Sequence, residues 1–232
     1  MKTYVLVHGA WHGGWCWKKV KPLLQAAGRE VYTPTLTGLG ERAHLLSRQV
    51  GLDTHVQDVV GVLEWEDLQD VVLVGHSYGG MVIAGVADRV AERLAHLVYL
   101  DSAVPSDGQA LLDCVGDRFR ADMAEAARSR GEGWRVPPWS AERLGLVDNA
   151  DAAWVIPKLV PQPYKAFQDP VRFRSPTALA LPRTYIHCVG QPPSARERPP
   201  FTAAMDYYRL AAGHNAMVTA PEELADLLLR LG

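Results

Sequence analysis

A serine stands at the centre of the pentapeptide Gly75–Gly79, which reads Gly-His-Ser-Tyr-Gly. The apolar residues 71–74 before it predict a buried strand, and residues 81–89 after it predict a helix. A strand, a G-x-S-x-G turn and a helix in this order are typical of a nucleophile elbow, where a tight turn strains the serine backbone and exposes its hydroxyl. We therefore predict an enzyme with Ser77 as its nucleophile. A chance match in a glycine-bearing loop is the alternative.

A serine hydroxyl is a weak nucleophile at neutral pH, so it needs a base, and the base needs an orienting group. His214 is the candidate base, because it lies between the last predicted strand, residues 207–210, and the last predicted helix, residues 221–231. For the other seven histidines we favour capping, packing or exposure. His8 and His12 are spaced i, i+4, but they flank a strand end and a glycine-rich loop, so we expect no metal site.

The loop after the first predicted strand, residues 8–15, is rich in glycine and can bring its backbone close to a ligand. We predict that the backbone amides of Ala10 and Tyr78 form an oxyanion hole, and that Gly9 and Trp11 contact substrate. A simple tight turn without a catalytic role is the alternative.

The residues above, with Lys21–Leu24 and with Ala216 and Met217 after Gly213 and His214, resemble the plant hydroxynitrile lyase and methyl-ester esterase group of α/β-hydrolases and its bacterial relatives. The resemblance covers nearly the whole chain and is weakest in residues 105–176. It implies an α/β-hydrolase fold, with Ser77 as nucleophile, His214 as base, and the amides of Ala10 and Tyr78 as oxyanion donors.

The chain departs from this group at the position of the triad acid. Plant members carry an aspartate just after the strand that matches residues 183–188, whereas this chain has Val189–Pro193, without a carboxylate. Asp101 ends the predicted strand 97–100, and other α/β-hydrolases take their acid from the strand next to the nucleophile. We predict Asp101 as the acid, with a turn-capping carboxylate as the alternative reading and Glu197 as the residual candidate.

A serine nucleophile favours acyl transfer, so we predict a carboxylic ester hydrolase that acts through an acyl-enzyme on a small to medium apolar ester. Within the resembling group, lyases carry a lysine and a threonine where this chain has Asn215 and Gly9, which favours the esterase branch. An acyltransferase, a non-catalytic binder of small molecules and a hydroxynitrile-lyase-like enzyme remain alternatives. Trp134 is predicted to line the substrate pocket, with core packing as its alternative.

The elements that must position these residues alternate between strand and helix. Strands are predicted at 3–8, 30–33 and 183–188, besides those named above, and helices at 15–27 and 52–64. The pattern predicts a doubly wound, mainly parallel sheet whose core is residues 1–104 and 177–232, with residues 105–176 as an inserted lid.

The composition excludes several classes of function. The 24 basic and 26 acidic residues leave a net charge of -2, without the excess of basic residues that a nucleic acid would select. The apolar runs are too short to span a membrane, so we expect a cytoplasmic protein that acts on a small-molecule ester or acyl substrate. No cofactor is implied, a homodimer is left open, and the three cysteines are predicted to be buried thiols.

Overall fold

The computed structural model describes residues 2–146, 148–190 and 205–232. Within these residues, six strands form one parallel sheet in the order β2-β1-β3-β4-β7-β8. The strands are β1 Thr3–Val7, β2 Glu30–Tyr32, β3 Val71–His76, β4 Leu94–Leu100, β7 Arg183–Cys188 and β8 Asp206–Leu210. From β1 the chain continues to β2 on one side, and from β3 it continues to β4 on the opposite side of the sheet. The carboxyl ends of β1 and β3 therefore flank the switch point, where ligands bind in such sheets.

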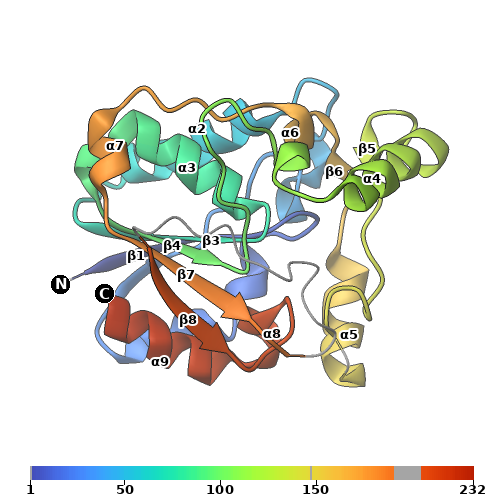
Figure 1. The fold of residues 1–232 in the computed structure, drawn as a ribbon. Coiled ribbons are helices and arrows are strands. Elements are labelled where there is room, and N and C mark those ends of the chain that lie inside the picture. The colour runs from blue at the N-terminus through green and yellow to red at the C-terminus, as the bar shows by residue number, and fades with distance from the viewer. Residues whose placement is uncertain (1, 147, 191–204) are drawn as a thin grey trace.

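Helices cover both faces of the sheet, which explains why the central strands are apolar throughout. Figure 1 shows α2, α3 and α7 on one face and α8 and α9 on the other, while α1 packs against α9. Every residue of β1 and β3 is buried. The helices of this core are α1 Val20–Ala26, α2 Leu52–Trp65, α3 Gly79–Val90, α7 Pro176–Ala180, α8 Ala216–Thr219 and α9 Pro221–Leu231. The predicted doubly wound α/β architecture is confirmed.

The helix predicted over residues 15–27 is wrong in its first half. The structure has a 3₁₀ helix over Gly14–Trp17, and α1 begins only at Val20. Pro22 is the reason, because a proline inside a continuous helix would remove one hydrogen bond and clash with the preceding turn, whereas it is tolerated within the first turn. The helix does end before Gly28, whose φ of 76° places it in the left-handed region.

The described part of residues 105–176 forms short elements. They are α4 Asp117–Arg130, β5 Arg135–Val136, α5 Asn149–Val155, β6 Gln162–Pro163 and α6 Lys165–Gln168, with β5 and β6 paired antiparallel. The elements α6, β6, β5 and α4 follow one another outward from the end of the helical layer that holds α2, and α5 lies beyond the carboxyl ends of β7 and β8 (Figure 1). Their role as a lid stays a prediction.

Two further predictions concern membranes and thiols. In the part of the chain that the structure describes, no helix combines the length and the apolar character that crossing a membrane requires. Cys16 and Cys188 are buried free thiols, as predicted, and Cys114 is half-buried.

Candidate active site

The turn between β3 and α3 holds Ser77 in a strained conformation, with a φ of 54°. Its backbone is pinned to β4, because the amide of Ser77 donates to the carbonyl of Leu100 over 3.1 Å. A Cβ atom on Gly75 would lie 2.6 Å from the carbonyl oxygen of Gly79, and one on Gly79 would lie 2.9 Å from that of Val7. Both glycines are therefore needed for strand and helix to meet at this angle.

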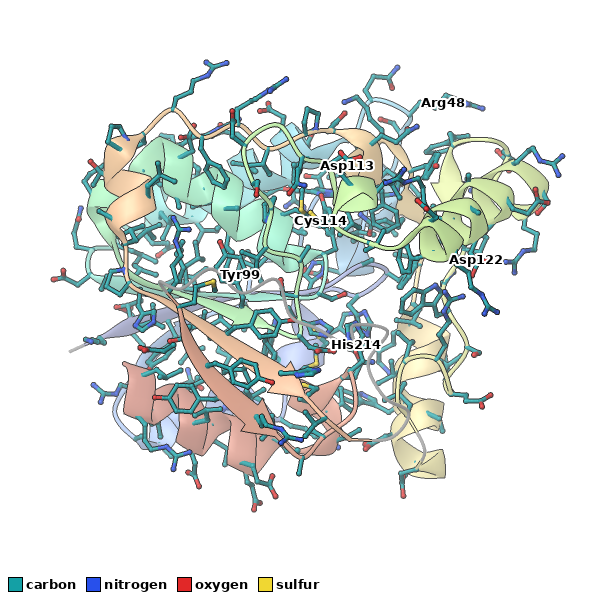
Figure 2. All side chains as sticks on the ribbon, viewed as in Figure 1. Arg48, Tyr99, Asp113, Cys114, Asp122 and His214 are labelled. Atoms are coloured by element: carbon teal, nitrogen blue, oxygen red, sulfur yellow. The ribbon has the colours of Figure 1, made fainter. Side chains whose placement is uncertain are left out.

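The side chains of Ser77, His214 and Asp101 form a hydrogen-bonded chain. Nε2 of His214 lies 2.9 Å from Oγ of Ser77, and Nδ1 of His214 lies 2.6 Å from Oδ2 of Asp101. A carboxylate only accepts, so Nδ1 carries the proton and Nε2 can accept the serine proton. The Asp101 side chain is 1% exposed and that of His214 17%. Figure 2 shows His214 near the carboxyl end of β7.

Asp101 directly follows β4, and its own φ is 42°. Its amide donates to the carbonyl of Ile186 over 2.8 Å, which fixes the start of the loop against β7. One carboxylate oxygen meets His214, and the other is buried without a hydrogen-bond partner within the described residues. The carboxylate is thus directed at the imidazole and away from the following turn. Glu197, the residual candidate, lies outside the residues that the structure describes.

The loop after β1 packs directly on the elbow. A Cβ on Gly9 would lie 2.8 Å from Nδ1 of His76 and 2.9 Å from Cβ of Ser77, so only glycine allows this approach. The amides of Ala10 and Tyr78 donate no hydrogen bond to any residue in the described ranges. Unpaired amides on both sides of a nucleophile can bind a developing oxyanion. Gly9 itself, which we predicted to contact substrate, lies against His76 and Ser77 of the elbow.

Trp11 is buried and held at a φ of 66°. Three hydrogen bonds hold it, all made with residues 136–162: its amide donates to Oε1 of Gln162, its Nε1 to the carbonyl of Val136, and its carbonyl accepts from the amide of Val160. Val136, Val160 and Gln162 therefore hold the loop that carries Ala10 in place.

The tryptophan that faces the imidazole is Trp139. Its ring centroid lies 6.3 Å from that of His214 and 4.8 Å from that of Trp11. Trp134, the tryptophan predicted to line the pocket, instead packs beside the guanidinium groups of Arg48 and Arg135, and no ring contact joins it to the catalytic candidates among the described residues. The sequence predicts that tryptophans of residues 105–176 line the pocket, but nothing local ranks Trp139 above Trp134, which we chose.

Three buried histidines, His8, His12 and His76, lie in the elbow and in the loop after β1. Burial lowers the pKa of His8 to about 3 and that of His12 to about 4, and burial together with the neighbouring His214 lowers the pKa of His76 well below its usual value. Nε2 of His76 donates to the carbonyl of His214 over 2.8 Å, which agrees with the structural role predicted for His76. Across the described ranges, no group of three or more potential ligands could hold a metal ion.

The sequence is similar to proteins of one known family. The sequence profile described as "Alpha/beta hydrolase family" matches residues 4–227. The chain belongs to this family. A carbendazim hydrolyzing esterase of Nocardioides sp. (strain SG-4G) is 41% identical to this α/β hydrolase over 250 aligned positions that cover all of both chains. The expected resemblance, the fold, and the prediction of an enzyme that hydrolyses esters are confirmed by these matches.

Other relatives of this α/β hydrolase include plant methylesterases and solved bacterial hydrolases. Methylesterase 1 of Arabidopsis thaliana is 32% identical over 62% of this chain and 54% of its own length. A pyrethroid hydrolase from Sphingobium faniae JZ-2 has a TM-score of 0.78 at 26% identity, over 99% of this chain and 96% of its own. An extracellular α/β-hydrolase from a Paenibacillus species has a TM-score of 0.86 at 22% identity, over 100% of this chain and 99% of its own, and supports the fold alone.

Proposed function

We propose that this α/β hydrolase cleaves carboxylic esters through an acyl-enzyme on Ser77. Oγ of Ser77 attacks the ester carbonyl while Nε2 of His214 takes its proton, and Asp101 stabilises the imidazolium that forms. The amides of Ala10 and Tyr78 bind the oxyanion. His214 then returns the proton to the leaving alcohol, and water releases the acid by the same steps. The hydrogen-bonded order Ser77, His214, Asp101 is the observation that carries this proposal.

The substrate that we propose is a small to medium ester with an apolar or aromatic group. Trp139 is half-buried and supplies aromatic surface beside His214, while the buried ring of Trp11 packs against it. Such surfaces bind apolar groups well. The relatives named above act on carbendazim, on pyrethroids and as methylesterases, which supports an ester of this class without naming the substrate of this chain.

Intact-protein mass spectrometry tests the nucleophile. After incubation with a serine-directed phosphonate, and separately with a panel of methyl and aryl esters, we expect one adduct per chain. Ser77→Ala should abolish both the adduct and ester turnover, whereas Ser106→Ala, a change at an exposed serine, should alter neither. An adduct that persists in Ser77→Ala would overturn the proposal.

Experiments on the same protein distinguish ester hydrolysis from the three alternative functions. A non-catalytic binder would give no adduct at Ser77. A transferase would pass the acyl group to an added alcohol or amine in preference to water, and a hydroxynitrile-lyase-like enzyme would release cyanide from mandelonitrile. We expect hydrolysis to dominate in each comparison.

A further inference from the structure

The two amides proposed as oxyanion donors each belong to a peptide group whose carbonyl end is also hydrogen-bonded. The amide of Ala10 shares its peptide with the carbonyl of Gly9, which accepts from Nδ1 of His8 over 2.8 Å. The amide of Tyr78 shares its peptide with the carbonyl of Ser77, and Oγ of Ser102 lies 2.9 Å from that oxygen. Buried side chains thus act on the far end of both donor peptides.

The hydrogen bonds of His8 define its tautomer. The amide of Leu36 donates to Nε2 of His8 over 3.1 Å, so Nε2 carries no proton and Nδ1 must carry one. The side chain is fully buried, and burial lowers its pKa to about 3, so the neutral ring persists across the physiological range. His8 therefore donates from Nδ1 to Gly9 in a single defined orientation.

The carbonyl of Ser77 accepts hydrogen bonds from several donors. Besides Oγ of Ser102, the amides of Ala103 and Gly80 donate to it over 3.1 and 3.2 Å. The hydroxyl of Ser102 also lies 3.1 Å from the carbonyl of Ala103, so its proton is shared between two acceptors. The effect of Ser102 on its peptide should accordingly be weaker than that of His8 on the Gly9–Ala10 peptide.

A hydrogen bond to a peptide carbonyl strengthens the N–H donor at the other end of the same peptide, and it fixes the plane of the group. Donors that are already oriented need no rearrangement when charge develops in the transition state. We propose that His8 and Ser102 are positioning residues that orient and polarise the two oxyanion-donor peptides, a role that rests on the function proposed above. A chain of bonds then runs from Leu36 through the imidazole of His8 and the Gly9–Ala10 peptide to the oxyanion.

The neighbouring peptide offers an internal comparison. His12 donates from Nδ1 to the carbonyl of Ala10 over 2.7 Å, and the amide of that peptide, which belongs to Trp11, donates to Gln162. This amide is already paired within the protein, so it is not a free oxyanion donor. His8 and His12 thus make the same kind of bond, but only the bond of His8 ends on a donor peptide.

Two substitutions at His8 separate its two hydrogen bonds. In His8→Asn the side-chain amide can take the place of Nδ1 and keep the donor to Gly9, while the acceptor for Leu36 is lost. In His8→Gln the side-chain amide reaches the place of Nε2, so the acceptor is kept and the donor to Gly9 is lost. We expect His8→Gln to lower kcat for a 4-nitrophenyl ester by about tenfold to a hundredfold, with KM little changed. His8→Asn should stay within about threefold of the parent protein, and Ser102→Ala should lose less than His8→Gln.

The inhibition constant Ki of a reversible trifluoromethyl ketone is a measurement that would not change if His8 had only a structural role. Its adduct with Ser77 carries an oxyanion, so its Ki should rise across the variants in proportion to the fall in kcat/KM. His96→Asn, at a half-buried histidine that contacts Thr184 on the neighbouring strand β7, should change neither value. Thermal unfolding reports whether each variant is folded. If His8→Gln does not fold, kcat and Ki of Ser102→Ala test the proposal instead.

Equal kcat and equal Ki in His8→Asn and His8→Gln would overturn this inference, whether both values match the parent protein or both fall together. Parent-like values in Ser102→Ala would overturn its second half. The two proposals can fail separately. If Ser77→Ala still reacts with the phosphonate, the proposed function fails, whereas Ser77-dependent hydrolysis with indistinguishable His8 variants refutes only the positioning role.

Discussion

Asp101 and His214 are 113 positions apart in the chain, yet Oδ2 of Asp101 lies 2.6 Å from Nδ1 of His214. The carboxylate reaches the imidazole from the end of β4, which pairs with the nucleophile strand β3 on one side and with β7 on the other. After β7, where the plant group carries its acid, Gly190 instead packs closely on Ala212, two residues before the histidine. The acid that we propose therefore lies one strand nearer to the nucleophile than the acid of the plant group.

Asp101→Asn should lower kcat on a 4-nitrophenyl ester by about two orders of magnitude or more, because an amide in this place favours the wrong imidazole tautomer and cannot stabilise the imidazolium. KM should change little, since Asp101 does not face the substrate in the proposed mechanism. Steady-state kinetics measure both values. Glu197→Gln is the comparison: if it removes activity while Asp101→Asn retains it, the assignment of the acid is wrong.

The sequence predicts the parts of the site that depend on local order. A strand, a G-x-S-x-G turn and a helix are contiguous, so Ser77 could be found without coordinates, and Asp101 and His214 follow because parallel strands end at one edge of the sheet. The partners of His8 could not be predicted, since its bond to Leu36 joins positions 28 apart through a loop without a regular pattern. Trp139 could not be ranked above Trp134, because aromatic residues in a segment of short elements carry no periodicity that distinguishes them.

Trp139, whose ring centroid lies 6.3 Å from that of His214, also lines a cavity of about 240 Å³ together with residues of α4, including Asp122 (Figure 2), and with Arg143. The guanidinium of Arg143 lies 4.3 Å from the ring centroid of Trp139. Trp139→Ala should join this cavity to the site and raise kcat/KM for bulky acyl esters relative to acetate esters, by about tenfold.

Trp134→Ala is the matched control for this prediction, because Trp134 is also a half-buried tryptophan of residues 105–176 but contacts Arg48 and Arg135. Its preference among a series of 4-nitrophenyl esters of increasing acyl length should match that of the parent protein. The interpretation of Trp139 as a pocket wall is wrong if both variants give the same profile.

Gly80 and Gly61 both lie in helices but differ in what a side chain would meet. A Cβ on Gly80 would lie 1.8 Å from Oγ of Ser102 and 2.1 Å from the carbonyl of Ala103, whereas one on Gly61 would meet nothing closer than 3.9 Å. Gly80→Ala should lower the free energy of unfolding by about 3 kcal/mol or more. Gly61→Ala should raise it by roughly 0.5–1 kcal/mol, because alanine is the better helix former. Urea denaturation measures both, and similar values would contradict the packing described for the elbow.

The free energy of unfolding should fall as the pH is lowered from about 6.5 toward 4. Burial, the largest cause in each case, lowers the pKa of His8 to about 3 and those of His12 and His55 to about 4, and it holds the pKa of His76 well below its usual value. In this pH window the unfolded chain therefore binds protons that the folded chain does not. The contribution of these histidines to the free energy of unfolding is fully present above their unfolded pKa of about 6.5. It is lost as the pH falls toward their pKa values in the folded protein.

Each such histidine contributes a slope of up to about 1.4 kcal/mol per pH unit, so four together should make unfolding steeply acid-sensitive. Urea denaturation at half-unit steps between pH 7 and pH 4.5 measures the slope. His55→Gln removes a histidine that lies outside the proposed triad and contacts Tyr78 and Thr37, and it should reduce proton uptake on unfolding by about one. A free energy of unfolding that stays flat across this range would show that these imidazoles are protonated in the folded protein, which would also contradict the neutral tautomers derived for His8 and His12.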